Sequence, residues 1–271
     1  VLSKTAFFYF NKMNNSPIGI FDSGIGGLSI LKEINRVLPN ENTIYLADNK
    51  NCPYGNKDIS DIIKLSLKNA SVLIKMNCKI IVVACNTATT NAIKEIRNSF
   101  TVPVIGIEPA IKPAILNTKT NKIGVLATEM TLTSNLFNQT SNKFSDNIEI
   151  IEQIGFGLVN LIEKGDINTG NTKRLLKSYI DPMLDLNIDQ LVLGCTHYHF
   201  LIPIIRQIMP EKITIQDPNK AIAKQIKKIL KSENLENTLK SNCKNKVYAN
   251  GNTEIINNII NSNGEVNSLD F

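Results

Sequence analysis

Short and almost uninterrupted apolar runs recur along this chain, and stretches with helical periodicity separate them. Because polar residues do not alternate with apolar ones in these runs, both faces of each strand should be buried. After the first run, Leu31, Ile34 and Leu38 share one helical face that ends at Pro39. This alternation predicts an α/β fold with mainly parallel sheets flanked by helices. The predicted strands are 18–21, 44–47, 80–84, 102–107, 123–127, 191–194, 213–215 and 246–249.

Two segments of the first half have counterparts in the second half, in the same order. IGIFDSG at 18–24 resembles IGVLATE at 123–129, and IIVVACNT at 80–87 resembles LVLGCTH at 191–197. The repetition predicts two similar α/β domains, with a site in the cleft between them. The stretch at 108–114 is the expected first crossing between the domains.

Composition narrows the function classes. The five cysteines are an odd number without tight spacing, which favours reduced thiols and a cytoplasmic protein over a disulfide framework. The net charge is +6, but aromatic residues make up only 6% of the chain, so nucleic-acid binding is not expected. No apolar stretch approaches the roughly 18–20 residues of a membrane-spanning helix. Residues 1–15 are expected to be an N-terminal extension, with a regulatory arm as the alternative.

Cys85 and Cys195 each follow a predicted strand, where ligands of open α/β sheets bind. Asn86 and Thr87 follow the first thiol and Thr196 the second, and these side chains are expected to cap helices. A helix N-terminus binds carboxylates and should lower the pKa of a nearby thiol. Two opposed thiols suit the inversion of a stereocentre, because one removes a proton while the other supplies one to the opposite face. The alternative is that both cysteines are inert core residues.

The glycine-rich stretch FDSGIGGLS at 21–29 allows two interpretations. Gly24 and Gly26, with Asp48 about 20 residues further on, partly match a dinucleotide-binding fingerprint, but Ser29 stands at the third glycine position. That match would make the chain an oxidoreductase. Otherwise the loop lets the backbone approach a small ligand, and Asp22 polarises a thiol, meets a substrate ammonium group or caps a helix.

No metal site is expected from the order Cys195-x-His197-x-His199, because ligands so close along a chain rarely converge on one ion without a distant partner. His197 is interpreted as a proton shuttle for Cys195, and His199 as incidental. The remaining thiols are interpreted as structural or surface residues; they are Cys52, Cys78 and Cys243.

The motifs FDSGIGGLSIL, CPYG, VVACNTAT, VLATEMT and LGCTHY, in this order, resemble those of the glutamate racemases of bacterial cell-wall synthesis. The resemblance implies a cofactor-independent, two-thiol enzyme that interconverts L- and D-glutamate and supplies D-glutamate for peptidoglycan. It implies that Cys85 handles the proton of the D enantiomer and Cys195 that of the L enantiomer, with Asp22 and His197 as their assistants. The related aspartate racemases tend to carry an acidic residue at the position of His197.

The same resemblance implies a site for a small-molecule substrate and a discontinuous first domain. The implied domains are 16–108 plus 216–271, and 109–215. Glu163 matches an acidic family position near the second thiol. Oligomer contacts vary among relatives and are not carried over, so the expectation of a homodimer does not rest on the resemblance. The chain departs from the family pattern at Asn51-Cys52 and at His199. The residues implied to line the substrate site are Asp22, Ser23, Tyr54, Gly55, Asn86, Thr87, Thr128, Thr196 and His197. A small-acid binding module and a racemase for another acid are the remaining alternatives.

Overall fold

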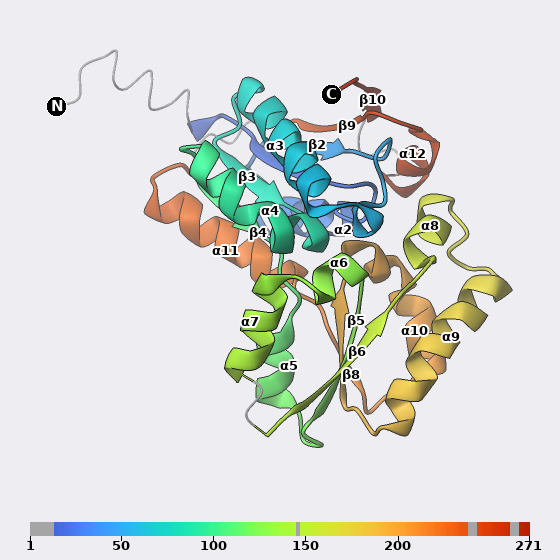
Figure 1. Cartoon of the computed structure of the whole chain (residues 1–271). Coiled ribbons are helices and arrows are strands. Elements are labelled where there is room, and N and C mark those ends of the chain that lie inside the picture. The colour runs from blue at the N-terminus through green and yellow to red at the C-terminus, as the bar shows by residue number, and fades with distance from the viewer. Residues whose placement is uncertain (1–13, 145–146, 238–242, 261–265) are drawn as a thin grey trace, which may run out of the picture.

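A computed structural model describes residues 14–144, 147–237, 243–260 and 266–271. Most of the predicted N-terminal extension therefore lies outside the described residues. The chain forms two parallel sheets, each flanked by helices, and the sheets lie in separate parts of the molecule (Figure 1). The predicted α/β fold with mainly parallel sheets is confirmed. No described helix is long and apolar enough to cross a membrane.

The first sheet has the strand order β10-β9-β2-β1-β3-β4, and all of its pairings are parallel. Strands β9 and β10 belong to this sheet although they come last in the chain. The strands are β1 (Ile18–Asp22), β2 (Thr43–Ala47), β3 (Ile80–Val83), β4 (Val104–Gly106), β9 (Asn245–Ala249) and β10 (Val266–Ser268). The accompanying helices are α2 (Leu28–Val37), η1 (Tyr54–Asn56), α3 (Ile59–Lys75), α4 (Asn86–Ser99), α11 (Asn219–Ser232) and α12 (Glu254–Ile260).

The second sheet is smaller, with the order β6-β5-β7-β8 and parallel pairing throughout. Its strands are β5 (Lys122–Ala127), β6 (Glu149–Ile154), β7 (Gln190–Gly194) and β8 (Thr214–Gln216). Its helices are α5 (Ile111–Asn117), α6 (Glu129–Leu132), α7 (Asn135–Phe144), α8 (Leu158–Glu163), α9 (Gly170–Asp185), η2 (Thr196–Leu201) and α10 (Ile202–Ile208). The exact bounds of the two domains stay a prediction.

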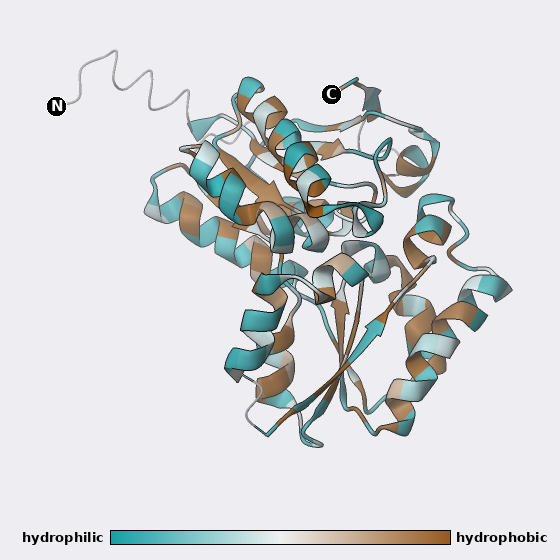
Figure 2. Ribbon diagram, viewed as in Figure 1, coloured by the Kyte–Doolittle hydropathy of each residue, from teal (hydrophilic) through white to brown (hydrophobic). Residues whose placement is uncertain are grey.

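All eight apolar runs form strands, because inner parallel strands bury both faces. Strands β1, β3 and β7 are buried along their whole length. Hydrophobic residues are concentrated on the strands, whereas the helices carry both hydrophobic and hydrophilic residues (Figure 2). Two edge strands were missed. Strand β6 is partly exposed and includes Glu149, Glu152 and Gln153, and β10 has only three residues.

Candidate active site

The carboxyl ends of the two sheets meet, and contacts between their loops join them. The loop after β1 belongs to the first sheet, and the start of η2 follows β7 of the second. Thr196 Oγ1 donates a hydrogen bond to Asp22 Oδ1 at 3.3 Å, and the backbone N–H of Ile25 donates to Glu163 Oε1 at 2.8 Å. The predicted residues of both halves are therefore brought together at one place.

Cys85 lies at the end of β3 and is the N-cap residue of α4. Its Sγ accepts a hydrogen bond from the backbone N–H of Ala88 at 3.5 Å, and the thiol donates to Ser23 Oγ at 3.7 Å. The prediction that Asn86 and Thr87 cap this helix is wrong, because the helix begins one residue earlier and the sulfur caps it.

The pKa of the Cys85 thiol is raised, mainly because burial disfavours the charged form and also because of the negative charge of Asp22. The hydrogen bond from Ala88 lowers the pKa but does not compensate. The expected lowering by a helix N-terminus is therefore wrong for Cys85, and the group is a neutral thiol at neutral pH. Cys195 contributes to the electrostatics of Cys85, so the two sulfurs are neighbours.

Asp22 lies between the first thiol and the second sheet and is completely buried. Its Oδ2 accepts hydrogen bonds from the backbone N–H groups of Gly24 and Gly27 at 3.1 and 3.2 Å, which is a capping role at the start of α2. Burial raises the pKa of Asp22 to about 6, although His197 and the two N–H groups act to lower it. Asp22 is therefore a buried acid beside Cys85 that titrates close to neutral pH.

Cys195 has a different set of neighbours. Its Sγ lies 3.8 Å from His197 Nδ1, and His197 Nε2 lies 2.5 Å from Glu163 Oε1. Burial acts to lower the pKa of His197, but hydrogen bonds with Cys195, Cys52 and Glu163 raise it well above its usual value. Burial acts to raise the pKa of Glu163, yet its hydrogen bond with His197 leaves that pKa lowered. An imidazolium–carboxylate pair thus stands beside Cys195, as a proton relay requires.

Polar groups beside the thiols can hold a small acid. Asn86 is 2% exposed and donates from Nδ2 to the Ile107 carbonyl at 3.2 Å, while its Oδ1 has no hydrogen-bond partner among the described residues. Thr87, Thr128 and Thr131 form a cluster of hydroxyl groups, with Oγ1–Oγ1 distances of 2.9, 2.9 and 3.4 Å. The cluster joins α4 of the first half to the β5–α6 loop of the second.

Tyr54 and Gly55 lie on η1, which contacts α6 beside this cluster. The Tyr54 hydroxyl is a hydrogen-bond partner of Asp48, and Asn69 Nδ2 donates to it at 3.0 Å. A side chain at Gly55 would meet Thr128, because an added Cβ would lie 2.8 Å from Thr128 Cβ. Of these two residues, Gly55 is therefore the one in contact with the hydroxyl cluster.

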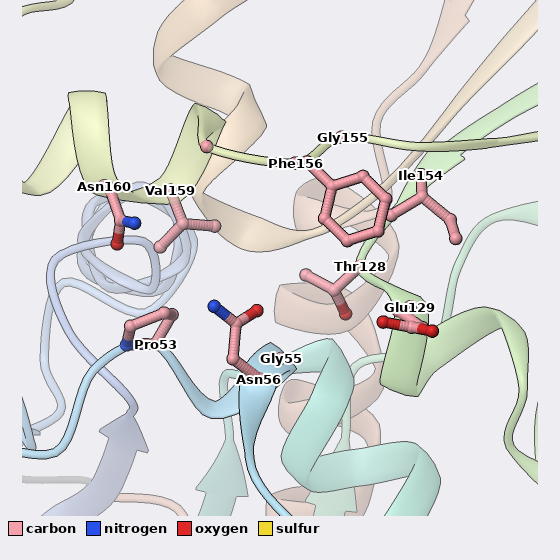
Figure 3. A pocket seen from close by; sticks show the side chains of 11 residues that line it. Pro53, Gly55, Asn56, Thr128, Glu129, Ile154, Gly155, Phe156, Val159 and Asn160 are labelled. Carbon is pink, nitrogen blue, oxygen red and sulfur yellow. The ribbon is translucent and has the colours of Figure 1, made fainter.

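A surface pocket leads from η1 toward the hydroxyl cluster (Figure 3). Pro53 and Asn56 line one side of it, and Val159 and Asn160 line the other. Thr128 belongs both to the pocket and to the hydroxyl cluster. The thiols themselves are only 4% and 6% exposed, so a substrate requires the two halves to move apart before it can enter.

The glycine-rich loop contacts the second half of the molecule. An added Cβ at Gly24 would overlap Glu163 Oε1, and one at Gly26 would lie 2.5 to 2.7 Å from atoms of Thr196 and His197. Asp48, the residue expected at a ribose hydroxyl in the dinucleotide interpretation, is 1% exposed and accepts hydrogen bonds from Asn51, Tyr54, Asn69 and Asn250. The loop is thus glycine-rich because side chains of the second sheet lie against it.

His199 faces away from the thiols. Its Nδ1 lies 3.1 Å from the Thr196 carbonyl oxygen and its Nε2 lies 3.2 Å from Asp217 Oδ1, so it holds η2 to the segment before α11. Cys52, by contrast, lies beside two residues of the candidate site, Glu163 and His197. The interpretation of Cys52 as merely structural or surface is therefore incomplete. Thr131 was missed, although its three-residue spacing from Thr128 on a short helix is a signal.

The Asp/Glu/Hydantoin racemase family matches residues 18–226 of the chain. The glutamate racemase of Ralstonia pickettii is 43% identical over 221 residues, which are 82% of this chain and 78% of that protein. The crystal structure of glutamate racemase from Francisella tularensis in complex with D-glutamate has a TM-score of 0.81 and 32% identity, and covers 93% of this chain and 97% of that one.

The Escherichia coli glutamate racemase, in complex with L-glutamate and the activator UDP-MurNAc-ala, has a TM-score of 0.82 and 30% identity. That likeness covers 94% of this chain and 98% of the other. The chain belongs to the Asp/Glu/Hydantoin racemase family. The three relatives are glutamate racemases, and this chain matches most of the length of each one.

Proposed function

We propose that the chain is a glutamate racemase, an isomerase that interconverts L- and D-glutamate with two thiol bases and no cofactor. The observation that carries this proposal is the pair of buried thiols at equivalent strand ends, each with its own acid–base partner. Asp22 and Ser23 accompany Cys85, and the His197–Glu163 pair accompanies Cys195. The glutamate-bound relatives support glutamate as the substrate.

In the direction from L- to D-glutamate, Cys195 takes the α-proton and Cys85 returns a proton to the opposite face. His197 Nδ1 lies 3.8 Å from the Cys195 sulfur, where the imidazole can take part in the proton transfers of that thiol. The raised pKa of Cys85 keeps that group protonated, as an acid must be. The reverse direction requires Cys85 to give up its proton first.

The substrate would lie between the thiols with its charged groups on the polar neighbours. The unpaired Asn86 Oδ1 is an acceptor for the ammonium group, and the hydroxyl cluster of Thr87, Thr128 and Thr131 offers donors to a carboxylate. Backbone N–H groups at the start of α4 and η2 stabilise negative charge as the carbanion develops. Closure of the two halves excludes water from this intermediate.

Racemisation of L-glutamate in deuterium oxide tests the proposal. Two bases require the D-glutamate formed first to carry deuterium at the α-carbon, while the remaining L-glutamate keeps protium. D-glutamate without deuterium would contradict the mechanism.

Removal of either thiol tests the assignment of the bases. Cys85→Ala and Cys195→Ala should each lower kcat by at least about 10³-fold, because a general base or acid is lost on one face. Cys243→Ser is the matched control. Cys243 precedes β9 and is not part of the site, so this variant should leave kcat unchanged. Normal racemisation by either alanine variant would refute the two-thiol assignment.

The same proposal includes a place in the cell. A glutamate racemase supplies D-glutamate for peptidoglycan, and we propose this role in the cytoplasm. A homodimer stays a prediction, which the mass measured by light scattering would test.

A further inference from the structure

Cys52, Glu163 and His197 bring three potential metal ligands together beside the second thiol. The sulfur, one carboxylate oxygen and one imidazole nitrogen all lie within 4.8 Å of one another. They come from the loop after β2, the end of α8 and the start of η2, so no short sequence motif joins them. Sulfur, nitrogen and oxygen from three side chains are a ligand set that Zn²⁺ accepts, with a fourth position left for water.

The spacing needs only small side-chain movements to fit an ion. Ligand atoms around a tetrahedral Zn²⁺ lie about 3.3–3.8 Å apart, given bond lengths of about 2.0–2.3 Å. The 2.5 Å between His197 Nε2 and Glu163 Oε1 would have to open, while all three ligand atoms already lie within 4.8 Å of one another. Rotation of the Glu163 side chain, which is 18% exposed, can supply much of this change.

The surroundings already orient the ligands. His197 Nδ1 faces Cys195 Sγ at 3.8 Å, which leaves Nε2 directed toward Glu163. The backbone N–H of Ile25 holds Glu163 Oε1 at 2.8 Å. Hydrogen bonds of this kind to a ligating carboxylate help to fix its orientation.

A groove from solvent reaches one of the three ligands, Glu163. The groove lies between the end of α8 and α12, and polar side chains line it. Its polar lining residues are Lys164, Asn252, Glu254 and Asn258. Cys52 is itself only half-buried. The route does not pass between the two catalytic thiols.

The proton relay beside Cys195 does not account for Cys52. His197 and Glu163 already connect that thiol to an acidic group, and Cys52 only adds a third side chain on the far side of the imidazole. A bound ion gives the additional sulfur a role.

We propose that Cys52, Glu163 and His197 form a site for Zn²⁺ or another thiophilic divalent cation, and that its occupation inhibits the enzyme. The ion would bind His197 Nε2, the atom that now faces Glu163. His197 could then no longer exchange a proton with Glu163. The inhibition rests on the proposed racemase function, whereas metal binding does not.

Cobalt substitution tests the binding site without reference to activity. Co²⁺ added to the metal-free full-length protein should produce the near-ultraviolet thiolate-to-cobalt charge-transfer band, and Zn²⁺ should remove it by displacement. The band should be lost in Cys52→Val and in Cys52→Ser, and kept in the control variant Cys243→Ser. A band that persists in a folded Cys52 variant, as a site on Cys85 and Cys195 would give, overturns the proposal.

Racemase assays test the consequence. Zn²⁺ should inhibit the wild type reversibly, with activity restored by a chelator, and inhibition should weaken at least 10-fold in Cys52→Val. Loss of the cobalt band together with unchanged zinc inhibition would show that inhibition arises elsewhere and refute that part. If no racemisation occurs in any variant while the cobalt band behaves as expected, the proposed function fails and the metal site stands.

Discussion

Gly26→Ala is a sharp test of how closely the two halves must meet. The added Cβ would lie 2.5 Å from Thr196 Oγ1, 2.6 Å from His197 Nδ1 and 2.7 Å from the His197 backbone nitrogen. Ordinary van der Waals contact begins at 3.4 Å. A side chain could rotate away, but the backbone nitrogen cannot, so the loop and η2 must separate by about 0.7 Å.

That displacement has a calculable effect on catalysis. A misplacement of about 1 Å in an active site can lower the rate about 10²-fold, so we expect kcat to fall by roughly 30- to 100-fold. The same overpacking should lower the free energy of unfolding by about 1–3 kcal/mol. Circular dichroism of glutamate follows racemisation, and urea unfolding measures stability.

Gly170→Ala is the matched control for this substitution. Gly170 begins α9, and an added Cβ there would meet only Arg174 Nη1 at an ordinary 3.8 Å. We expect unchanged activity and equal or slightly greater stability, since alanine favours helices. If Gly26→Ala racemises glutamate within about twofold of the wild type, the halves do not need this close approach and the reasoning is refuted.

Two further substitutions test buried charges by urea unfolding. The pKa of Asp22 is about 6 in the folded protein and 3.8 for the unperturbed group. The stability that its neutral form contributes is therefore fully present below pH 3.8 and is lost as pH rises through 6. Relative to the wild type, the free energy of unfolding of Asp22→Asn should therefore rise by about 3 kcal/mol between pH 4 and pH 7. If the two proteins lose stability with pH in the same way, the raised pKa of Asp22 is refuted. Lys79 Nζ lies 2.6 Å from Glu41 Oε2, and both side chains are almost fully buried. Lys79→Met leaves the Glu41 carboxylate buried without its partner, so the free energy of unfolding should fall by about 3–5 kcal/mol. The exposed pair of Lys122 and Glu149 is the control, and Lys122→Met should lose less than about 1 kcal/mol.

The strands could be predicted because of where they lie in their sheets. Inner strands such as β1 and β7 are buried on both faces, and that burial leaves a continuous apolar run in the sequence. The edge strand β6 is partly exposed, so its sequence EIIEQI mixes charged and apolar residues. Such a segment carries no signal that distinguishes an edge strand from a loop.

The thiols could be predicted for a related reason, but their electrostatics could not. A cysteine directly after a buried parallel strand lies at the edge where ligands bind, which placed Cys85 and Cys195 correctly at the meeting of the two sheets. The helix N-terminus that should lower the pKa of Cys85 is a local feature of the sequence. Burial by the other half of the molecule is not local, and it determines the direction of the shift.

Contacts between the halves explain what sequence reasoning missed. Cys52 and Thr131 contact the site through residues far away in the chain, whereas Glu163, which the family resemblance indicated, is held there by Ile25 of the first half. The glycine-rich loop is the common element, because Gly24 lies against Glu163 and Gly26 against His197. Opening the halves to admit a substrate would break the bond from Ile25 to Glu163 and the bond from Thr196 to Asp22 together. Both bonds tie the loop after β1 to the second half, so opening would remove the contacts of Asp22 and Glu163 across the interface at once, and closure would restore the two contacts together.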